Sequence, residues 1–503
     1  MVDVQKETIE GVEYHKVGKE YFDKRGLKRH ARIWSLWALG VGAVISGDFF
    51  GWNFGLASGF WGLFIATVII TVMYLGLCYS IAEMSPALPH TGGAYSFGRS
   101  AMGPWGGFIT GLGENMEYVL TPAVIVVGIG GYLGAVFGTP DSFAPIWWLA
   151  AYLVFIGLNI WGIEITFQFT VLITFVALAI LVIFFIGALP LFSWKLALNV
   201  PAGPGGSAFL PQGWMGVAYA LPFAIWFYLA IEELPLAAEE SHDPKRDMPR
   251  GITLGLLTLI ITAFLTLFFN AGIEPGAAGV ATSNEPLFLA FKAIFGSGVG
   301  TKLLALIAVA GLVASFHTII FAYGRNIYSL SRAGYFPHWL SVTHRTRKTP
   351  HVALIIGGLL GFVAAILIQY SKAIFGNVPV GAVLLNMAVF GAVISYALQC
   401  FSFILLRKKL PHIERPYRSP LGNAGAWVAL IIAVLTLIFL FQNPDYRVGV
   451  YGCAIWYACG VLYFGLIGRK KLVYSPEEDF AVTERAKAGL YKEKSQAPAE
   501  KPA

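Results

Sequence analysis

Long apolar runs alternate with short polar segments along most of this chain. A run of about 20 apolar residues is the length that a helix needs to cross a bilayer. The pattern therefore predicts an all-α membrane protein with twelve transmembrane helices. These are expected over residues 33–57, 60–83, 104–137, 146–162, 165–189, 215–237, 251–273, 302–330, 352–370, 380–406, 424–442 and 448–468.

Lysine and arginine are distributed unevenly between the two sets of loops. If the N-terminus lies inside, only five of the 35 basic residues fall outside: Lys195, Lys292, Lys302, Lys372 and Arg447. Because basic loops are retained in the cytoplasm, we expect a multi-pass protein of the cytoplasmic (inner) membrane with both termini cytoplasmic. The chain then divides into an N-terminal segment (1–32), a transmembrane domain (33–470) and a cytoplasmic tail (471–503).

The two terminal segments differ from the rest of the chain in composition. Residues 1–32 alternate charges with aromatic residues, which predicts an interfacial anchor, with a cytoplasmic gate as the alternative. The tail from Tyr474 onwards is rich in Glu, Lys, Ala and Pro, and we expect it to be mobile and solvated.

Composition narrows the class of protein. The chain is 57% hydrophobic and 13% charged, against about 25% charged residues in soluble domains. Its net charge of +7 follows from the basic inside loops and indicates no nucleic-acid partner. The four cysteines lie in apolar spans without metal-ligand spacing, so we expect no disulfide framework, no metal site and no cofactor.

A carboxylate interrupts the first span at Ser46-Gly47-Asp48. An acid near the centre of a span costs roughly 2.5 to 3.5 kcal/mol and so needs a partner or a function. Gly42, Gly47, Gly51 and Gly55 give the surrounding backbone more freedom than a plain helix needs. We predict that the helix breaks here and holds a small cation.

Two further spans carry acids. Glu114 and Glu117 share a face of the third span, which contains no Lys or Arg. They either meet a cation or carry a proton, and the alternative for one of them is a bond to a neighbouring backbone. The sixth span is interrupted at Ala230–Pro235, five spans after the first break. Two broken helices in corresponding positions predict an inverted repeat of five plus five helices, 33–190 and 215–406, with helices 424–468 added and a substrate site at the midplane.

Three motifs resemble the amino acid, polyamine and organocation transporters. The first is the AEM, proline, GG and Tyr pattern at 82–95, the second is E-x-x-x-P-x-R at 240–246, and the third is S-R-x-G-x-x-P at 331–337. The resemblance implies a LeuT-like fold and alternating access. Trp226 and Glu232 stand at the same distances from the second motif as a gating Trp and a Glu in the arginine and agmatine exchanger. Glu117 falls near a substrate contact of that family.

The stretches 44–53, 314–317 and 322–325 resemble the ethanolamine permease branch closely. The resemblance implies import of ethanolamine. A small amino acid, choline or another amine is the alternative substrate, and a membrane-embedded sensor or enzyme is a remote one. No catalytic constellation occurs on an inside segment, so we expect a transporter and not an enzyme.

Residue types suggest how such a site would work. The substrate would be a small amine, held in the bilayer by carboxylates, aromatic faces and a free backbone or hydroxyl group. We expect Asp48 or Glu117 to bind the ammonium, and Glu232 to act as a gating or proton-linked acid. The remaining candidates are Ser46, Gly47, Tyr118, Phe223 and Trp226 for binding and His317 for proton coupling. His317 has a structural hydrogen-bonding role as its alternative. The coupling ion stays open between H⁺ and Na⁺, and the sequence does not indicate the oligomeric state.

Overall fold

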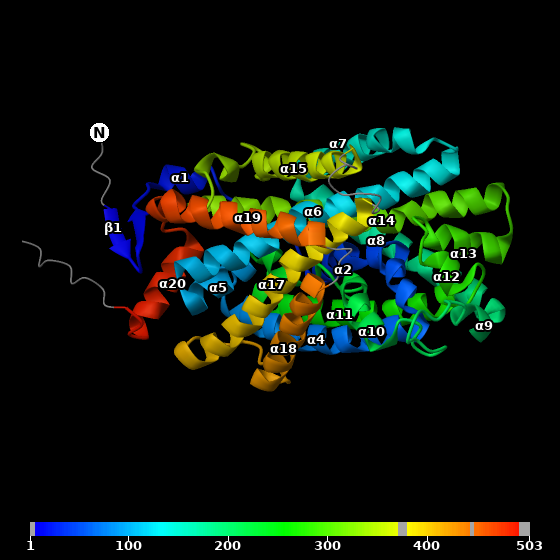
Figure 1. The fold of residues 1–503 in the computed structure, drawn as a ribbon. Helices are drawn as coiled ribbons and strands as arrows, with labels where there is room; N and C mark the ends of the chain where they lie inside the picture. The colour runs from blue at the N-terminus through cyan, green and yellow to red at the C-terminus, as the bar shows by residue number, and fades with distance from the viewer. Residues whose placement is uncertain (1–5, 371–379, 443–446, 492–503) are drawn as a thin grey trace, which may run out of the picture.

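The computed structural model describes residues 6–370, 380–442 and 447–491. It is an elongated bundle of helices whose long axis runs across Figure 1. Strand β1 (Lys6–Ile9) and helix α20 (Pro476–Lys487) lie together at one end, and α9 (Trp194–Ala197), α12 (Gly276–Val280) and α13 (Pro286–Phe295) lie at the other. We call the end with β1 and α20 the tail face.

Within the described residues, ten helices are long and apolar enough to cross a membrane. They coincide with ten of the predicted spans. They are α4 (Phe60–Ala87), α6 (Pro104–Phe137), α7 (Ala144–Trp161), α8 (Ile163–Ala188), α10 (Gly213–Trp226) continued by η4 (Ile231–Glu240), α11 (Pro244–Ala271), α14 (Val299–Arg332), α17 (Val380–Lys409), α18 (Gly422–Gln442) and α19 (Arg447–Leu466). The ninth predicted span is the shorter apolar helix α15 (His351–Tyr370).

The first predicted span is a broken helix. Helices α2 (Ile33–Val44) and α3 (Ser46–Phe49) follow one another almost without interruption, and the 3₁₀-helix η1 (Trp52–Ser58) leaves them at an angle of 45°. The break therefore lies at Phe50 and Gly51, three residues further along the chain than the predicted position at Gly47-Asp48. Gly51 has φ +98°, a left-handed conformation that a residue without a Cβ adopts readily.

The predicted break in the sixth span is present. Helix α10 ends at Trp226, and the chain resumes as η4 at Ile231. Ala230 between them has φ +85°, which is unfavourable for a residue with a Cβ. Strain of this kind persists where the surrounding packing enforces it, and it is common at functional sites.

Buried polar groups mark the interior helices. In Gly213–Glu240, which carries Glu232 and Glu233, 83% of the most apolar 18 residues are buried, whereas in the more apolar Ile163–Leu191 one-third are. Lipid solvates apolar side chains as well as protein does, so hydrophobicity gives no reason for the most apolar helices to be inside. Polar groups need partners, and the helices that carry them (α6, α10 with η4, α14 and α17) form the centre of the bundle.

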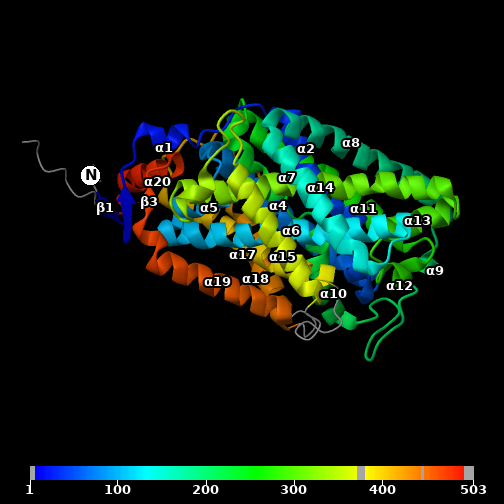
Figure 2. The same cartoon turned by 90° about the horizontal axis from the view of Figure 1, so that it is seen from above.

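Short elements link the long ones. They are α1 (Lys19–Asp23), α5 (Ala94–Met102), η2 (Asp141–Phe143), η3 (Leu189–Leu191), η5 (His338–Ser341) and η7 (Gly468–Lys470). Viewed from above, α5 lies beside α20 and β3 (Leu472–Val473) near the tail face (Figure 2).

The terminal segments correct two expectations. Residues 6–15 form a hairpin of β1 and β2 (Val12–His15), and β3 pairs with β2 in parallel, so the chain is not purely α-helical. The tail is ordered as far as helix α20, where Glu477, Glu478 and Arg485 are buried. The expectation of a solvated tail is therefore wrong for residues 474–491, because the acids of α20 find buried arginine and tyrosine partners on the bundle.

Candidate substrate-binding site

The two helix breaks lie against each other. Gly47 packs on the backbone of Trp226 so closely that a Cβ would overlap the Trp226 carbonyl oxygen. The indole Nε1–H of Trp226 donates to the carbonyl oxygen of Phe50 at 2.9 Å, which satisfies an acceptor that the break leaves without a helical partner. Gly51 lies beneath the same indole ring. Glycine at both positions therefore allows the two broken helices to cross.

The helix α14 anchors the first break. The Ser46 amide donates to Ser315 Oγ at 2.8 Å, and Ser315 Oγ–H donates to the Gly42 carbonyl at 2.7 Å. On the other side, Tyr132 donates its hydroxyl hydrogen to the Phe49 carbonyl at 2.9 Å. The Ser46 amide is thus already bonded, so a substrate would have to displace Ser315 to use it.

Asp48 is buried on α3 and faces α11. Its carboxyl group lies against the hydroxyls of Thr266 and Thr262, and Tyr228 is close by. Its Oδ1 has no hydrogen-bond partner within the described ranges. Asp48 and Glu117, the two candidate ammonium partners, have different neighbours: Asp48 lies against α11, and Glu117 lies against Glu232 and Tyr396.

Glu117 and Glu232 form the centre of a second polar cluster. Their carboxyl groups contact each other, and Tyr396 donates to Glu117 Oε1 at 2.9 Å. Tyr74 donates in turn to Tyr396 at 3.1 Å. The carboxyl group of Glu232 also lies near the backbone amides of Ala230 and of Glu232 itself. These amides begin η4, where the helix dipole favours negative charge.

Glu114 is hydrogen-bonded by side chains of two helices. Its carboxyl group accepts from Asn326 Nδ2 at 2.9 Å and from the Tyr118 hydroxyl at 3.2 Å. The Tyr118 hydroxyl lies 3.5 Å from Glu232 Oε1. Tyr118 therefore bridges Glu114 to the pair of Glu117 and Glu232.

Glu233 is a fourth acid at this place. It is fully buried, and neither of its carboxyl oxygens has a hydrogen-bond partner among the residues described. Within the described residues, no Lys, Arg or His side chain contacts Glu114, Glu117, Glu232 or Glu233. Four neighbouring carboxyl groups in a medium of low polarity cannot all be charged, so they share protons or attract a cation.

The last two predicted residues are His317 and Phe223. His317 is buried between α7 and α8, where its ring nitrogens are 3.1 Å from Asn159 Nδ2 and 3.4 Å from the Thr166 carbonyl. These partners match the structural alternative for His317. Phe223 packs near Phe54 of η1, with ring centroids 6.2 Å apart.

Sequence reasoning missed the residues that support the acids. Tyr74, Tyr396 and Asn326 lie on three different long helices, so no local spacing relates them to Glu117 or Glu114. Two arginines lie in or near the motifs that the sequence analysis identified, so the sequence did mark their positions. Arg325 pairs with Glu240 at 2.9 Å, and Arg332 pairs with Glu239 at 2.6 Å and with Glu477 at 2.8 Å. The motifs around residues 240 and 332 are thus bound to each other, and these pairs join η4 to α14 beside the tail face.

A bundle of membrane-crossing helices around two touching breaks and a buried acidic cluster defines a membrane transporter. The chain belongs to the amino acid permease family, whose family model (Amino acid permease) matches residues 32–467, and hence to the amino acid, polyamine and organocation superfamily. Proteins of this family are permeases and not enzymes.

Several relatives align along most of the chain. An uncharacterised transporter of Rhizobium meliloti (strain 1021) is 29% identical over 85% of this chain and 90% of its own length. The branched-chain amino acid permease BcaP of Bacillus subtilis (strain 168) is 26% identical over 89% and 94%. A D-serine/D-alanine/glycine transporter of Escherichia coli (strain K12) is 22% identical over 75% and 80%.

Proposed function

We propose that this permease is a secondary transporter that imports ethanolamine across the cytoplasmic membrane. The observation that carries the proposal is the contact between the Glu117 and Glu232 carboxyl groups, which face no basic side chain in the described part of the chain. A zwitterion would bring a second anion into this acidic cluster, whereas a small ammonium compound brings only the missing cation.

The ammonium group is assigned to Glu117, with Glu232 as the proton-linked acid. Tyr118 and Trp226 provide aromatic faces on which a cation is attracted, and Phe223 closes the wall near η1. Ser46 and Gly47 bring the first break to the same crossing, and Asp48 stays the alternative ammonium partner. The polar contacts of His317 run to α7 and α8 and away from the acids, so we assign proton coupling to Glu232 before His317. Na⁺ is the alternative coupling ion.

The transport cycle is alternating access. We assign twelve transmembrane helices to the chain, arranged as two inverted repeats of five with two additional helices. Both broken helices lie at the first position of a repeat and meet at Gly47 and Trp226, which supports this arrangement. We assign the tail face to the cytoplasmic side, which the distribution of basic residues among the loops supports. There the pairs of Arg325 with Glu240 and Arg332 with Glu239 would open when substrate leaves inward.

The test is uptake of labelled ethanolamine by the purified full-length protein in proteoliposomes, with internal and external pH and Na⁺ varied separately. Accumulation driven by an inward proton gradient, with strong competition by ethanolamine and weak competition by alanine, supports the proposal. A small amino acid is the second candidate, because two relatives carry names of amino acid transporters. Alanine or glycine displacing labelled ethanolamine completely at lower concentration would favour it.

Single substitutions separate the two acidic positions. Glu117→Gln keeps the shape of the side chain and removes its charge, and we expect at least about a hundredfold loss of affinity, the equivalent of an ion pair of about 3 kcal/mol. Asp48→Asn tests the alternative ammonium partner in the same assay. Glu164→Gln is the matched control, because Glu164 is exposed at the start of α8. Unchanged affinity in Glu117→Gln would contradict this assignment.

A further inference from the structure

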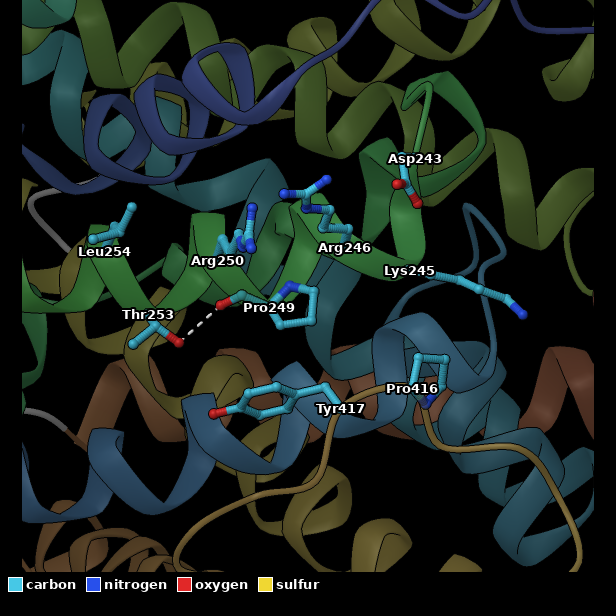
Figure 3. Close-up of a pocket in the computed structure, with 9 residues that line it drawn as sticks. All are labelled: Asp243, Lys245, Arg246, Pro249, Arg250, Thr253, Leu254, Pro416 and Tyr417. Carbon is cyan, nitrogen blue, oxygen red and sulfur yellow. Dashed lines mark hydrogen bonds between the residues drawn. The ribbon is translucent and has the colours of Figure 1, made fainter.

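An open groove lies on the flank of the molecule near the tail face, between the start of α11 and the chain after α17. Its volume is about 790 Å³. Figure 3 shows that Pro249 and Thr253 extend from α11 toward Tyr417, whereas Arg246, Arg250 and Leu254 extend from the other side of the same helix. A volume of this size accommodates a small organic molecule of drug size or larger. The groove is separate from the two helix breaks, since neither Trp226 nor the acidic cluster contributes to its lining.

The charged residues of the lining are predominantly basic. Three of its nine residues are Lys245, Arg246 and Arg250, and one, Asp243, is acidic. Lys245 is already paired with Glu414 at 3.0 Å. The side chains of Arg246 and Arg250 are exposed, and within the described ranges neither makes a hydrogen bond or an ion pair shorter than 4 Å. Asp247 lies between them and interacts with both, but it does not bind either guanidinium directly.

Arg246 and Arg250 begin a continuous exposed stripe on α11. The next exposed residues on this face are Leu254, Leu257 and Ile261, which are 43%, 55% and 52% exposed. Steps of three or four residues keep all five side chains on one side of the helix. The stripe therefore changes from two arginines to three large apolar residues within one turn. Such a change marks the boundary between lipid headgroups and hydrocarbon.

The wall of the groove opposite α11 contains Tyr417, a residue type that is common at the membrane–water interface. Tyr417 is partly exposed and lies across the groove near Thr253, whose hydroxyl donates to the Pro249 carbonyl at 2.8 Å (Figure 3). Tyrosine is enriched at the headgroup level because its ring is apolar and its hydroxyl is polar. The groove thus offers two guanidinium groups and an apolar stripe on one side of α11, and hydroxyls on the side that faces Tyr417.

We propose that this groove binds one anionic phospholipid. Arg246 and Arg250 hold the phosphate, since guanidinium groups match phosphate oxygens with paired hydrogen bonds. Tyr417 and Thr253 line the remaining wall of the groove. The acyl chains lie along Leu254, Leu257 and Ile261. Inorganic phosphate has no apolar part that could contact the stripe, whereas a phospholipid has acyl chains. The arrangement therefore favours a lipid over inorganic phosphate.

The experiment measures lipid binding to the full-length protein in a neutral detergent by native mass spectrometry, with phosphatidylglycerol, phosphatidylcholine and inorganic phosphate as separate probes. We expect the wild type to bind phosphatidylglycerol at least tenfold more tightly than phosphatidylcholine. The double variant Arg246→Gln/Arg250→Gln should lose this preference. The control Arg345→Gln/Arg347→Gln removes two exposed arginines elsewhere on the chain and should retain it.

Two outcomes would overturn the proposal. One is an unchanged preference for phosphatidylglycerol in Arg246→Gln/Arg250→Gln. The other is inorganic phosphate displacing phosphatidylglycerol at equal concentration, which would show a site for free anions. A second measurement uses the wild type alone and so does not depend on the folding of a variant. Photoactivatable phosphatidylglycerol should crosslink to residues 245–261 or 416–417, and crosslinks confined to other segments would also contradict the site.

Discussion

At Gly47 a single hydrogen atom in place of a side chain allows the two broken helices to touch. A Cβ at this position would meet the Trp226 carbonyl, which is backbone and cannot rotate away. We therefore predict that Gly47→Ala separates the two breaks, lowers stability by about 1–3 kcal/mol and abolishes transport. Thermal unfolding in detergent and uptake in proteoliposomes measure the two effects.

The control for this prediction is Gly157→Ala. Gly157 lies within α7, and a Cβ there meets nothing within 4 Å. Alanine favours a helix over glycine by about 1 kcal/mol, so this variant should be as stable as the wild type or slightly more so. Equal transport by Gly47→Ala and Gly157→Ala would contradict the importance of the close approach.

His90 provides a prediction about pH. It lies in the turn between α4 and α5, with its ring 5.6 Å from that of Phe480 on α20. Burial lowers the pKa of His90 from 6.5 to about 4, against the opposing effect of Glu239 and with a contribution from Arg332. Between these two values the unfolded chain binds a proton that the folded chain does not bind. Stability should therefore fall as pH decreases from 6.5 to 4, by at most about 1.4 kcal/mol per pH unit.

The variant His90→Gln isolates this effect from other titrating groups. Its melting temperature in detergent should depend less on pH than that of the wild type between pH 4 and 6.5. Above pH 7 the two proteins should show the same pH dependence. Parallel curves over the whole range would show that His90 is not kept neutral by its surroundings.

At the scale of elements, the sequence predicts that helices break but not where they turn. Glycine and acid mark the first break, yet α3 continues as a helix through Ser46–Phe49 and ends where Phe50 bonds to Trp226. The final position is set by a partner 176 residues away, which local propensity does not register. The neighbours of Asp48 and Glu117 were not predictable for a similar reason. Residue type identifies each as a costly buried acid, but the helix that each side chain faces depends on the rotation of its own helix. The long helices were predictable because lipid exposure requires a sustained apolar run.

The contact between the breaks gives a prediction for Trp226. Trp226→Phe retains a ring but removes the Nε1–H that bonds to the Phe50 carbonyl. A buried carbonyl without a partner costs about 1–3 kcal/mol, so we expect a lower melting temperature and reduced uptake. Trp214→Phe is the matched control on the same helix, because Trp214 is 72% exposed. An identical melting temperature in both variants would show that the indole bond contributes nothing to the break.

At the scale of the whole molecule, the N-terminal hairpin and helix α20 are joined to the bundle by buried polar contacts. Tyr14 of β2 and Glu478 of α20 are 464 residues apart and bond to each other at 2.6 Å. The sequence could not predict this contact. A segment rich in charged residues is expected to be exposed to solvent unless the distant residues that bind its charges are known. Glu478 also binds Arg99 of α5, so the hairpin, the tail helix and the turn before α6 meet at one carboxylate.

Glu478 is therefore the position at which the tail face is most sensitive to substitution. Its two oxygens accept from Tyr14 at 2.6 Å, Arg99 Nε at 2.7 Å, Tyr95 at 2.5 Å and Tyr335 at 3.0 Å, and both Arg99 and Glu478 are fully buried. Glu478→Gln removes the charge and leaves Arg99 with Glu10, which itself also binds Arg485. Breaking one side of a buried ion pair costs about 3–5 kcal/mol. We expect the hairpin and α20 to detach from the bundle before the long helices unfold.

Limited proteolysis and thermal unfolding distinguish this local effect from global unfolding. In Glu478→Gln, cleavage within residues 474–491 should become faster at a temperature at which the transmembrane helices remain intact. The control is Glu484→Gln on the same helix, whose partners Lys487 and His412 are 60% and 40% exposed. Exposed pairs contribute about 0–1 kcal/mol, so this variant should be cleaved at the wild-type rate. Equal protection of the tail in both variants would mean that other contacts hold α20 in place, and that Arg99 tolerates burial with Glu10 alone.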